Sequence, residues 1–79
     1  MKYIEVYSTN NCPWCVRAKA LLKSKGLDYE EIDVSADTER TLEMVERSGR
    51  RTVPQIFIDN EPVGGFVELS ALNKAGKLE

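Results

Sequence analysis

A strand, a short polar loop and a helix follow one another within the first 26 residues of this 79-residue chain, and this order constrains its fold more than any other feature. Residues 2–7 are rich in β-branched and aromatic side chains and predict a strand. After the polar loop of residues 8–11, residues 13–25 predict a helix that ends at Gly26. Residues 29–34 predict a second strand, parallel to the first and reached through a right-handed crossover.

The only two cysteines of the chain, Cys12 and Cys15, lie where the loop meets the first helix. Cys12 falls at the predicted N-cap, and Pro13 takes the first helical position, where its missing N–H costs little. A thiolate at Cys12 would meet unpaired backbone N–H groups and the positive end of the helix dipole, which are expected to lower its pKa. Cys15 lies about one turn further in and more buried, within reach of a mixed disulfide at Cys12. The pair therefore predicts redox chemistry.

Three other interpretations of the cysteines remain open. A Cys-x-x-Cys segment can form half of a zinc site, but a closed site needs about four ligands. Without histidine or a third cysteine, two chains would have to share the metal. A structural disulfide would close too short a loop to restrain the unfolded chain much, and ordinary buried cysteines would have no reason to lie at a helix N-terminus. A Cys-x-x-Cys segment near a strand–helix–strand pattern favours redox function over all three.

Length and composition predict one domain that spans residues 1–79, with a modest core. The 11 basic and 13 acidic residues give a net charge of −2, which indicates neither a nucleic acid nor an anionic membrane as partner. No apolar run is long enough to span a bilayer, and the N-terminus lacks the pattern of a signal peptide. We therefore expect a cytoplasmic protein, in a reducing compartment where disulfides are usually transient and catalytic.

The middle of the chain predicts a second helix, which residues 35–37 open and Gly49 ends. Its apolar positions are few: Leu42 and Val45 form a thin stripe toward the core, and Met44 flanks that stripe. The apolar pattern of this helix is consequently the weakest among the predicted elements.

The last third of the chain predicts a hairpin and a third helix. Residues 53–58 are almost continuously apolar, as in a strand buried on both faces, and Pro54 suits the start of such a strand. Residues 59–60 predict a tight turn into a short strand that ends at Gly64, and a helix follows over residues 67–75. The chain is thus predicted to be an α/β protein of order β-α-β-α-β-β-α, with a four-stranded mixed sheet flanked by three helices.

Three segments in register resemble the glutaredoxin family, which has the thioredoxin fold. They are Cys12-Pro13-Trp14-Cys15, then Thr52-Val53-Pro54-Gln55-Ile56-Phe57-Ile58, then Gly64-Gly65-Phe66. Their separations are usual in that family, and the resemblance covers nearly the whole chain. Trp14 stands where the common dithiol form of the family has tyrosine. The resemblance implies that the Cys12 thiolate attacks a disulfide and that Cys15 resolves the mixed disulfide, whereas Cys12 alone suffices for glutathionylated proteins.

The resemblance also implies a substrate groove. A cis Val53–Pro54 bond would place the Val53 backbone beside Cys12, where its N–H and C=O can pair with a disulfide-bearing peptide. We expect an exposed Trp14 to form a docking surface beside the disulfide, with a plain surface aromatic as the alternative. The residues implied to bind glutathione or substrate are Trp14, Thr52, Val53, Pro54, Gly65, Phe66, Val67, Glu68 and Arg51. The resemblance implies glutathione as a co-substrate, but no bound cofactor and no metal, since relatives with proline after the first cysteine tend not to hold an iron–sulfur cluster.

The chain departs from the family in two places that concern glutathione. The loop before Cys12 holds no lysine, and Val67-Glu68 replaces a Ser, Thr or Asp followed by Asp. Glu68 can still approach the ammonium of the ligand, but Val67 offers only its backbone N–H at a helix N-terminus. We therefore expect a weakened affinity for glutathione. A basic cluster either compensates from the rim of the groove or belongs to a solvated helix end: Arg47, Arg50 and Arg51.

The leading hypothesis is a glutathione-dependent thiol–disulfide oxidoreductase that reduces protein disulfides and glutathione mixed disulfides as a monomer. Its expected partners are glutathione and disulfide-containing or glutathionylated proteins, with neither nucleic acid nor membrane among them. A rival hypothesis, motivated by Thr9 and Val67, is a redoxin that thioredoxin reductase reduces and that donates hydrogen to ribonucleotide reductase. A third is a non-catalytic module that binds a partner near Trp14 or a metal between two chains.

Overall fold

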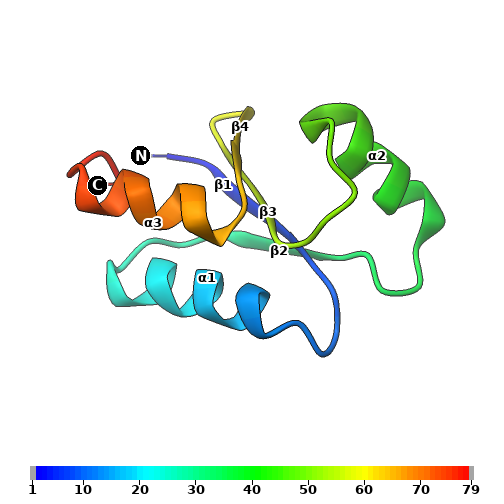
Figure 1. Ribbon diagram of the computed structural model, residues 1–79, viewed down its shortest axis with the longest axis horizontal. Coiled ribbons are helices and arrows are strands. Elements are labelled where there is room, and N and C mark those ends of the chain that lie inside the picture. The colour runs from blue at the N-terminus through cyan, green and yellow to red at the C-terminus, as the bar shows by residue number, and fades with distance from the viewer. Residues whose placement is uncertain (1, 79) are drawn as a thin grey trace.

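The computed structural model describes residues 2–78, which form one four-stranded sheet and three helices (Figure 1). The elements in chain order are β1 (Ile4–Ser8), α1 (Pro13–Ser24), β2 (Glu30–Asp33), α2 (Thr38–Ser48), β3 (Gln55–Ile58), β4 (Glu61–Gly64) and α3 (Phe66–Lys74). The strand order across the sheet is β2-β1-β3-β4. Strands β1 and β2 are parallel, whereas β1–β3 and β3–β4 are antiparallel. The predicted fold class and element order are thereby confirmed.

The sheet separates two layers of helices. Helices α1 and α3 lie side by side on one face, and α2 covers the other (Figure 1). Because successive side chains of a strand point to opposite faces, Ile4 and Val6 of β1 pack toward α1 and α3, while Tyr7 packs toward α2. The α1 side is an apolar cluster that includes Ala18, Leu22, Ile56, Leu69 and Leu78.

Helix α1 begins and ends where local signals predict. Cys12 is its N-cap and Pro13 its first residue, and Gly26, two residues beyond its last residue, adopts a left-handed φ of 70°. The buried face consists of Cys15, Ala18 and Leu22, one turn apart. Packing this face against the sheet fixes the distance of the cysteine-bearing end from the sheet and its rotation about the helix axis.

Helix α2 differs from the prediction in the face that it buries. Met44 is buried and 1% exposed, whereas Leu42, predicted to face the core, is 55% exposed; Val45 is half-buried. Positions 44 and 47 are one turn apart, so Met44 shares its face with Arg47. Arg47 pairs with Glu5 of β1 across 2.8 Å and holds this face of the helix against the sheet. A polar anchor, absent from the apolar pattern, therefore sets the rotation of α2.

The third strand begins at Gln55 instead of residue 53, because Pro54 has no N–H to donate to the sheet. The predicted hairpin is confirmed: Asp59 and Asn60 have φ of 51° and 69°, the left-handed values that a tight two-residue turn requires. Helix α3 begins at Phe66, one residue earlier than predicted. Among residues 2–78, no helix has the length and apolar character needed to cross a membrane.

Candidate functional site

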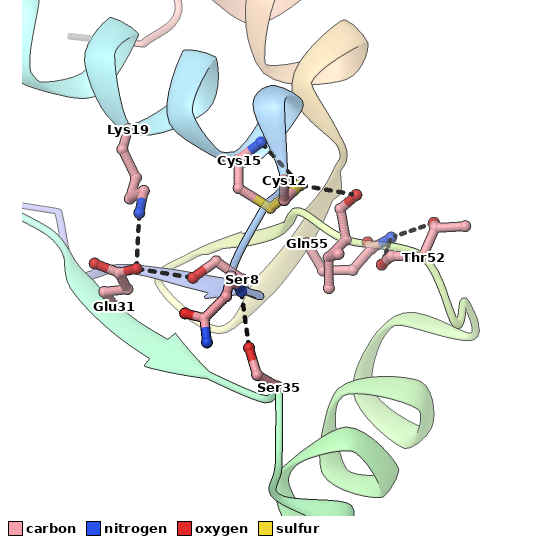
Figure 2. Close-up of a disulfide and its surroundings, with 10 residues drawn as sticks. Ser8, Cys12, Cys15, Lys19, Glu31, Ser35, Thr52 and Gln55 are labelled. Atoms are coloured by element: carbon pink, nitrogen blue, oxygen red, sulfur yellow. Dashed lines mark hydrogen bonds and ion pairs between the residues drawn. A yellow bond between two sulfur atoms is a disulfide. The ribbon is translucent and has the colours of Figure 1, made fainter.

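The two cysteines form a disulfide at the N-terminus of α1, with their Cα atoms 5.2 Å apart (Figure 2). Cys12 is half-buried, whereas Cys15 is only 1% exposed. The backbone N–H of Cys15 donates a hydrogen bond to Cys12 Sγ over 3.1 Å. The Cys12 sulfur therefore serves as the helix cap and is the sulfur of the pair that lies closer to solvent.

The loop before β3 brings a second segment to the cysteines. The Val53–Pro54 bond is cis, as expected, and the Val53 carbonyl oxygen lies 3.9 Å from Cys12 Sγ. The Gln55 side-chain amide donates hydrogen bonds to the Thr52 carbonyl oxygen and Oγ1, over 2.9 and 3.1 Å (Figure 2). Gln55 itself is buried, so these bonds tie the loop to the sheet. The Val53 backbone is thereby held beside the disulfide.

A groove of about 250 Å³ extends from this loop to the start of α3. It brings together eight of the residues that the sequence implies, all except Arg51. Arg50 lines the groove in its place, because its guanidinium reaches across to Glu68, 3.4 Å away. The lining residues are Trp14, Arg50, Thr52, Val53, Pro54, Gly65, Phe66, Val67 and Glu68.

The Glu68 carboxylate already has two partners within this chain. Its Oε1 accepts a hydrogen bond from the Gly65 backbone N–H over 2.6 Å, which caps α3, and Arg50 is its ion-pair partner. The Gly65 N–H, together with Arg50, lowers the pKa of the Glu68 carboxyl below its ordinary value. A Cβ on Gly64 would lie 2.6 Å from the same oxygen, so glycine at 64 leaves the room in which the carboxylate sits. By capping α3, Glu68 fixes the start of the helix that lines one end of the groove.

Trp14 forms the exposed wall of the groove. Its side chain is 49% exposed, as expected, with the Phe66 ring centroid 5.7 Å away. The Arg17 guanidinium lies over the indole ring, 4.7 Å from its centroid. Val67 next to it is 69% exposed. The role of Trp14 in docking a substrate remains a prediction.

A second, more polar hollow of about 550 Å³ borders Cys12 on the side of the loop. Its residues are Thr9, Asn10, Asn11, Cys12, Pro13, Val16, Lys19 and Glu31. Lys19 and Glu31 pair across 2.8 Å, and the buried Ser8 hydroxyl donates to the same carboxylate over 2.9 Å (Figure 2). These two bonds lower the pKa of the Glu31 carboxyl.

Lys19 is therefore a cation of the hollow beside Cys12 that the sequence motifs did not indicate. Its spacing of seven residues from Cys12, about two helical turns, was the available signal. In the part of the chain that the structure describes, no group of three or more His, Cys, Asp or Glu side chains is arranged to hold a metal ion.

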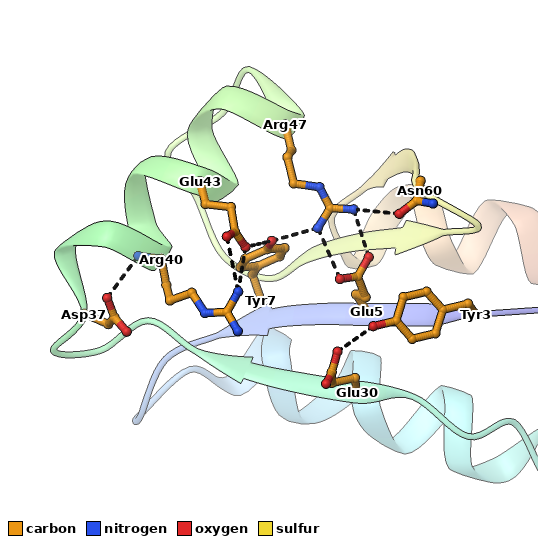
Figure 3. A network of polar contacts seen from close by, with 9 residues as sticks. All are labelled: Tyr3, Glu5, Tyr7, Glu30, Asp37, Arg40, Glu43, Arg47 and Asn60. Carbon is orange, nitrogen blue, oxygen red and sulfur yellow. Dashed lines mark hydrogen bonds and ion pairs between the residues drawn. The ribbon is translucent and has the colours of Figure 1, made fainter.

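Arg47 lies on the opposite face of the sheet from the groove, so it does not compensate there. Its guanidinium bonds Glu5 and the Tyr7 hydroxyl (Figure 3). It also lies 4.0 Å from the Phe57 ring centroid. Tyr7 is fully buried and donates to Glu43. The structure thus places Tyr7 and Arg47 in the layer between the sheet and α2.

Comparison with known proteins finds glutaredoxins among both sequences and solved structures. The sequence model of the glutaredoxin family matches residues 4–63. The whole chain is 47% identical to glutaredoxin 3 of Escherichia coli (strain K12) and covers 95% of it. It is 44% identical over 79 residues to a glutaredoxin of Pseudomonas aeruginosa, 94% of which is covered.

Two solved structures share the fold closely. The glutaredoxin from Brucella melitensis is 53% identical with a TM-score of 0.83, over 96% of this chain and 83% of that one. A buckwheat glutaredoxin–glutathione complex has a TM-score of 0.88 at 28% identity, over 98% of this chain and 73% of the buckwheat chain.

Proposed function

This chain belongs to the glutaredoxin family and is a thiol–disulfide oxidoreductase, and we propose that glutathione supplies its electrons. The observation that carries the proposal is the groove that starts at the cis Val53–Pro54 bond, beside Cys12, and ends at α3. Its substrates are then protein disulfides and proteins that carry glutathione in a mixed disulfide. The reaction suits a reducing compartment, and we place it in the cytoplasm.

The reaction begins when the Cys12 thiolate attacks a substrate sulfur. A new S–S bond joins the two, the S–S bond of the substrate breaks, and its second sulfur leaves as a thiolate that takes a proton from water. The Cys15 N–H and the positive end of α1 face the Cys12 sulfur and stabilise its negative charge. Because the thiolate is the attacking species, these contacts favour the reaction at neutral pH.

Cys15 completes the reduction of a protein disulfide. As a thiolate it attacks Cys12 within the mixed disulfide, which forms the Cys12–Cys15 disulfide and releases the substrate with both of its sulfurs reduced. Cys15 is buried, so the sulfur within its reach is that of Cys12, which is already joined to the substrate. Two glutathione molecules then reduce the internal disulfide and leave as glutathione disulfide.

A glutathionylated protein needs Cys12 alone. Attack on the glutathione sulfur releases the protein thiol and leaves glutathione bound to Cys12. A second glutathione thiolate attacks that glutathione sulfur, so glutathione disulfide leaves and the Cys12 thiolate is restored.

The groove has the features of a small peptide site. The Val53 backbone beside Cys12 offers an N–H and a C=O for strand-like pairing with a ligand. Arg50 contributes a cation, and the backbone N–H groups at the start of α3 suit a carboxylate. The similar fold of the buckwheat glutaredoxin–glutathione complex supports glutathione as the ligand.

Glutathione should nevertheless bind weakly. Glu68 Oε1 is already bonded to Gly65 and Arg50, and Val67 contributes no polar side chain. A missing charge-assisted hydrogen bond typically costs about 1.5–3 kcal/mol. The same two observations favour a second candidate, a redoxin that thioredoxin reductase reduces and that serves ribonucleotide reductase.

Electron supply to the oxidised protein separates these two candidates. The oxidised protein is mixed with NADPH and either glutathione plus glutathione reductase or thioredoxin reductase alone, and NADPH consumption is followed. We expect rapid turnover with glutathione, with a Cys12→Ser variant giving the background rate. Turnover with thioredoxin reductase only would replace the proposal by the second candidate.

A further inference from the structure

We infer that the protein substrates of this enzyme are acidic polypeptides that place an apolar side chain in a trough running from Thr52 past Trp14 to Lys74. The inference rests on the proposed function in one respect, namely that protein disulfides are substrates. It adds the chemistry of the polypeptide on either side of the reacting cysteine.

The trough consists of two hollows that join. The groove beside Pro54 and a neighbouring hollow of about 280 Å³ share Trp14, Phe66 and Val67. The second hollow continues along α3 through Ser70, Ala71 and Lys74. At a rise of 1.5 Å per residue, the eight steps from Phe66 to Lys74 along α3 extend the trough by about 12 Å, the length of about four residues of extended chain. A tripeptide bound at Cys12 does not reach that far, whereas a polypeptide does.

The apolar lining of the trough is open to solvent. Trp14 is 49% exposed and Val67 is 69% exposed, so both of these apolar side chains are open to solvent. Trp14 contacts the Phe66 ring and the Arg17 guanidinium. An exposed aromatic side chain with such neighbours is typical of a surface that binds a partner.

The rim of the trough is basic. Arg17 lies over Trp14, while Arg50 and Lys74 line the two hollows. Among the described residues that line them, Glu68 is the only acid; Arg50 and Glu68 pair, so Arg17 and Lys74 give the rim its net positive charge. The carboxylates lie elsewhere: residues 28–46 carry only Arg40 as a base against Asp28, Glu30, Glu31, Asp33, Asp37, Glu39, Glu43 and Glu46. The chain thus has a net charge of −2 but a basic rim along the trough, which attracts acidic partners and repels basic ones.

A single-turnover exchange reaction tests this without glutathione or a reductase. The reduced Cys15→Ser variant is mixed with a peptide whose only cysteine is disulfide-bonded to thionitrobenzoate. Cys12 attacks the peptide sulfur, the peptide remains bound to Cys12, and coloured thionitrobenzoate leaves with its electron pair. One peptide flanks its cysteine with leucine and glutamate, a second replaces each glutamate by lysine, and a third replaces each leucine by serine.

We expect the acidic peptide to react about tenfold faster than the basic one at low ionic strength, and this ratio to fall toward one in high salt. The serine peptide should react several-fold more slowly than its leucine counterpart. Equal rates for the acidic and basic peptides, or faster reaction of the basic one, would overturn the charge preference. Equal rates for the leucine and serine peptides would overturn the apolar contact.

Matched charge reversals locate the effect. Lys74→Glu, alone and with Arg17→Glu, should reduce the acidic-over-basic ratio stepwise. Lys23→Glu, which changes the charge equally in an exposed residue about 16 Å along α1 from Cys12, should leave it within about twofold. If Lys23→Glu acts as strongly as Lys74→Glu, net charge and not the trough is responsible. Since the exchange needs no glutathione, a failed electron-supply experiment leaves this test unaffected.

Discussion

At the scale of single residues, Cys12 combines a structural and a chemical role in one atom. Its sulfur accepts the Cys15 backbone N–H, which makes it the N-cap of α1, and it faces the Val53 carbonyl oxygen from the other side. The N–H group that would be unsatisfied at any helix start is thus directed at the sulfur that must bear negative charge. The reactivity that we propose for Cys12 rests on this position at the helix terminus.

Substitution of each cysteine separates the two proposed roles. Cys12→Ser should abolish all turnover without unfolding the protein, because serine is itself a good N-cap. Cys15→Ser should retain reduction of glutathionylated substrates and lose reduction of protein disulfides. Both activities are measured by NADPH consumption, and circular dichroism provides the folding control. Substantial activity in Cys12→Ser, or equal loss of both activities in Cys15→Ser, would show that the roles are misassigned.

Gly64 is required by the carboxylate that caps α3. It has a φ of 117°, and an added Cβ would lie 2.6 Å from Glu68 Oε1. Gly64→Ala should therefore cost about 3 kcal/mol of unfolding free energy, from backbone strain and displacement of the carboxylate. Gly49→Ala is the matched control, since Gly49 also has positive φ but open space around it, and it should cost about 1 kcal/mol. Urea unfolding that gives equal losses would disprove the steric role.

At the scale of elements, α2 is held to the sheet largely by polar groups. Met44 is its one fully buried side chain among the described residues. Beside it, Arg47 bonds Glu5 and the buried Tyr7 hydroxyl, and Tyr7 also bonds Glu43 (Figure 3). Glu5 is only 8% exposed, so its carboxylate depends on Arg47 for compensation.

Removal of this anchor should destabilise the fold without disabling the chemistry. Arg47→Met leaves the Glu5 carboxylate buried and unpaired, and we expect a loss of about 3 kcal/mol by urea unfolding. The double variant Glu5→Gln, Arg47→Met should recover part of that loss, because no buried charge is left. Under conditions where the variants are folded, turnover should match the wild type, since the anchor and α1 lie on opposite faces of the sheet. A double variant as unstable as the single one would show that packing of the arginine, over the Phe57 ring, matters more than its charge.

At the scale of the whole molecule, the fold distributes charge unevenly and pairs many of its carboxylates. Hydrogen bonds lower the pKa of four carboxyl groups: Glu31 from Lys19, Asp33 from Ser35, Glu43 from Tyr7 and Glu68 from the Gly65 N–H. A carboxyl with a lowered pKa in the folded state stabilises the fold above the pKa of the unfolded chain, and this contribution is lost as the pH falls through the folded pKa.

The stability of the protein should therefore be nearly constant from pH 7 to about pH 5 and decrease below about pH 4.5, where the unfolded chain binds more protons than the folded one. Urea midpoints measured across this range test the expectation. Glu68→Gln should flatten part of the decrease, because one of the four contributing carboxyl groups is gone. Stability that rises as the pH falls below 4.5 would contradict the sign of these shifts.

Local signals in the sequence determined where the helices and strands of this protein begin and turn. The β-branched strand, the polar loop and Pro13 place Cys12 at a helix start, and Asp59-Asn60 makes the hairpin turn. The reason is that caps, turns and strand alternation act over a few neighbouring residues, which the sequence displays directly.

Only the tertiary structure decided which side chains meet across the chain. It buries Met44 in place of Leu42, because Arg47 finds Glu5 on a strand some forty residues away. It assigns the groove to Arg50 and not Arg51, engages Glu68 in capping, and brings Lys19 to the hollow at Cys12. Long polar side chains reach several ångströms in many directions, and their partners are fixed by where the backbone of distant elements lies. Periodicity carries no information about those partners, so the position of Cys12 at a helix start could be predicted from sequence, but the pairing of the charged groups near it could not.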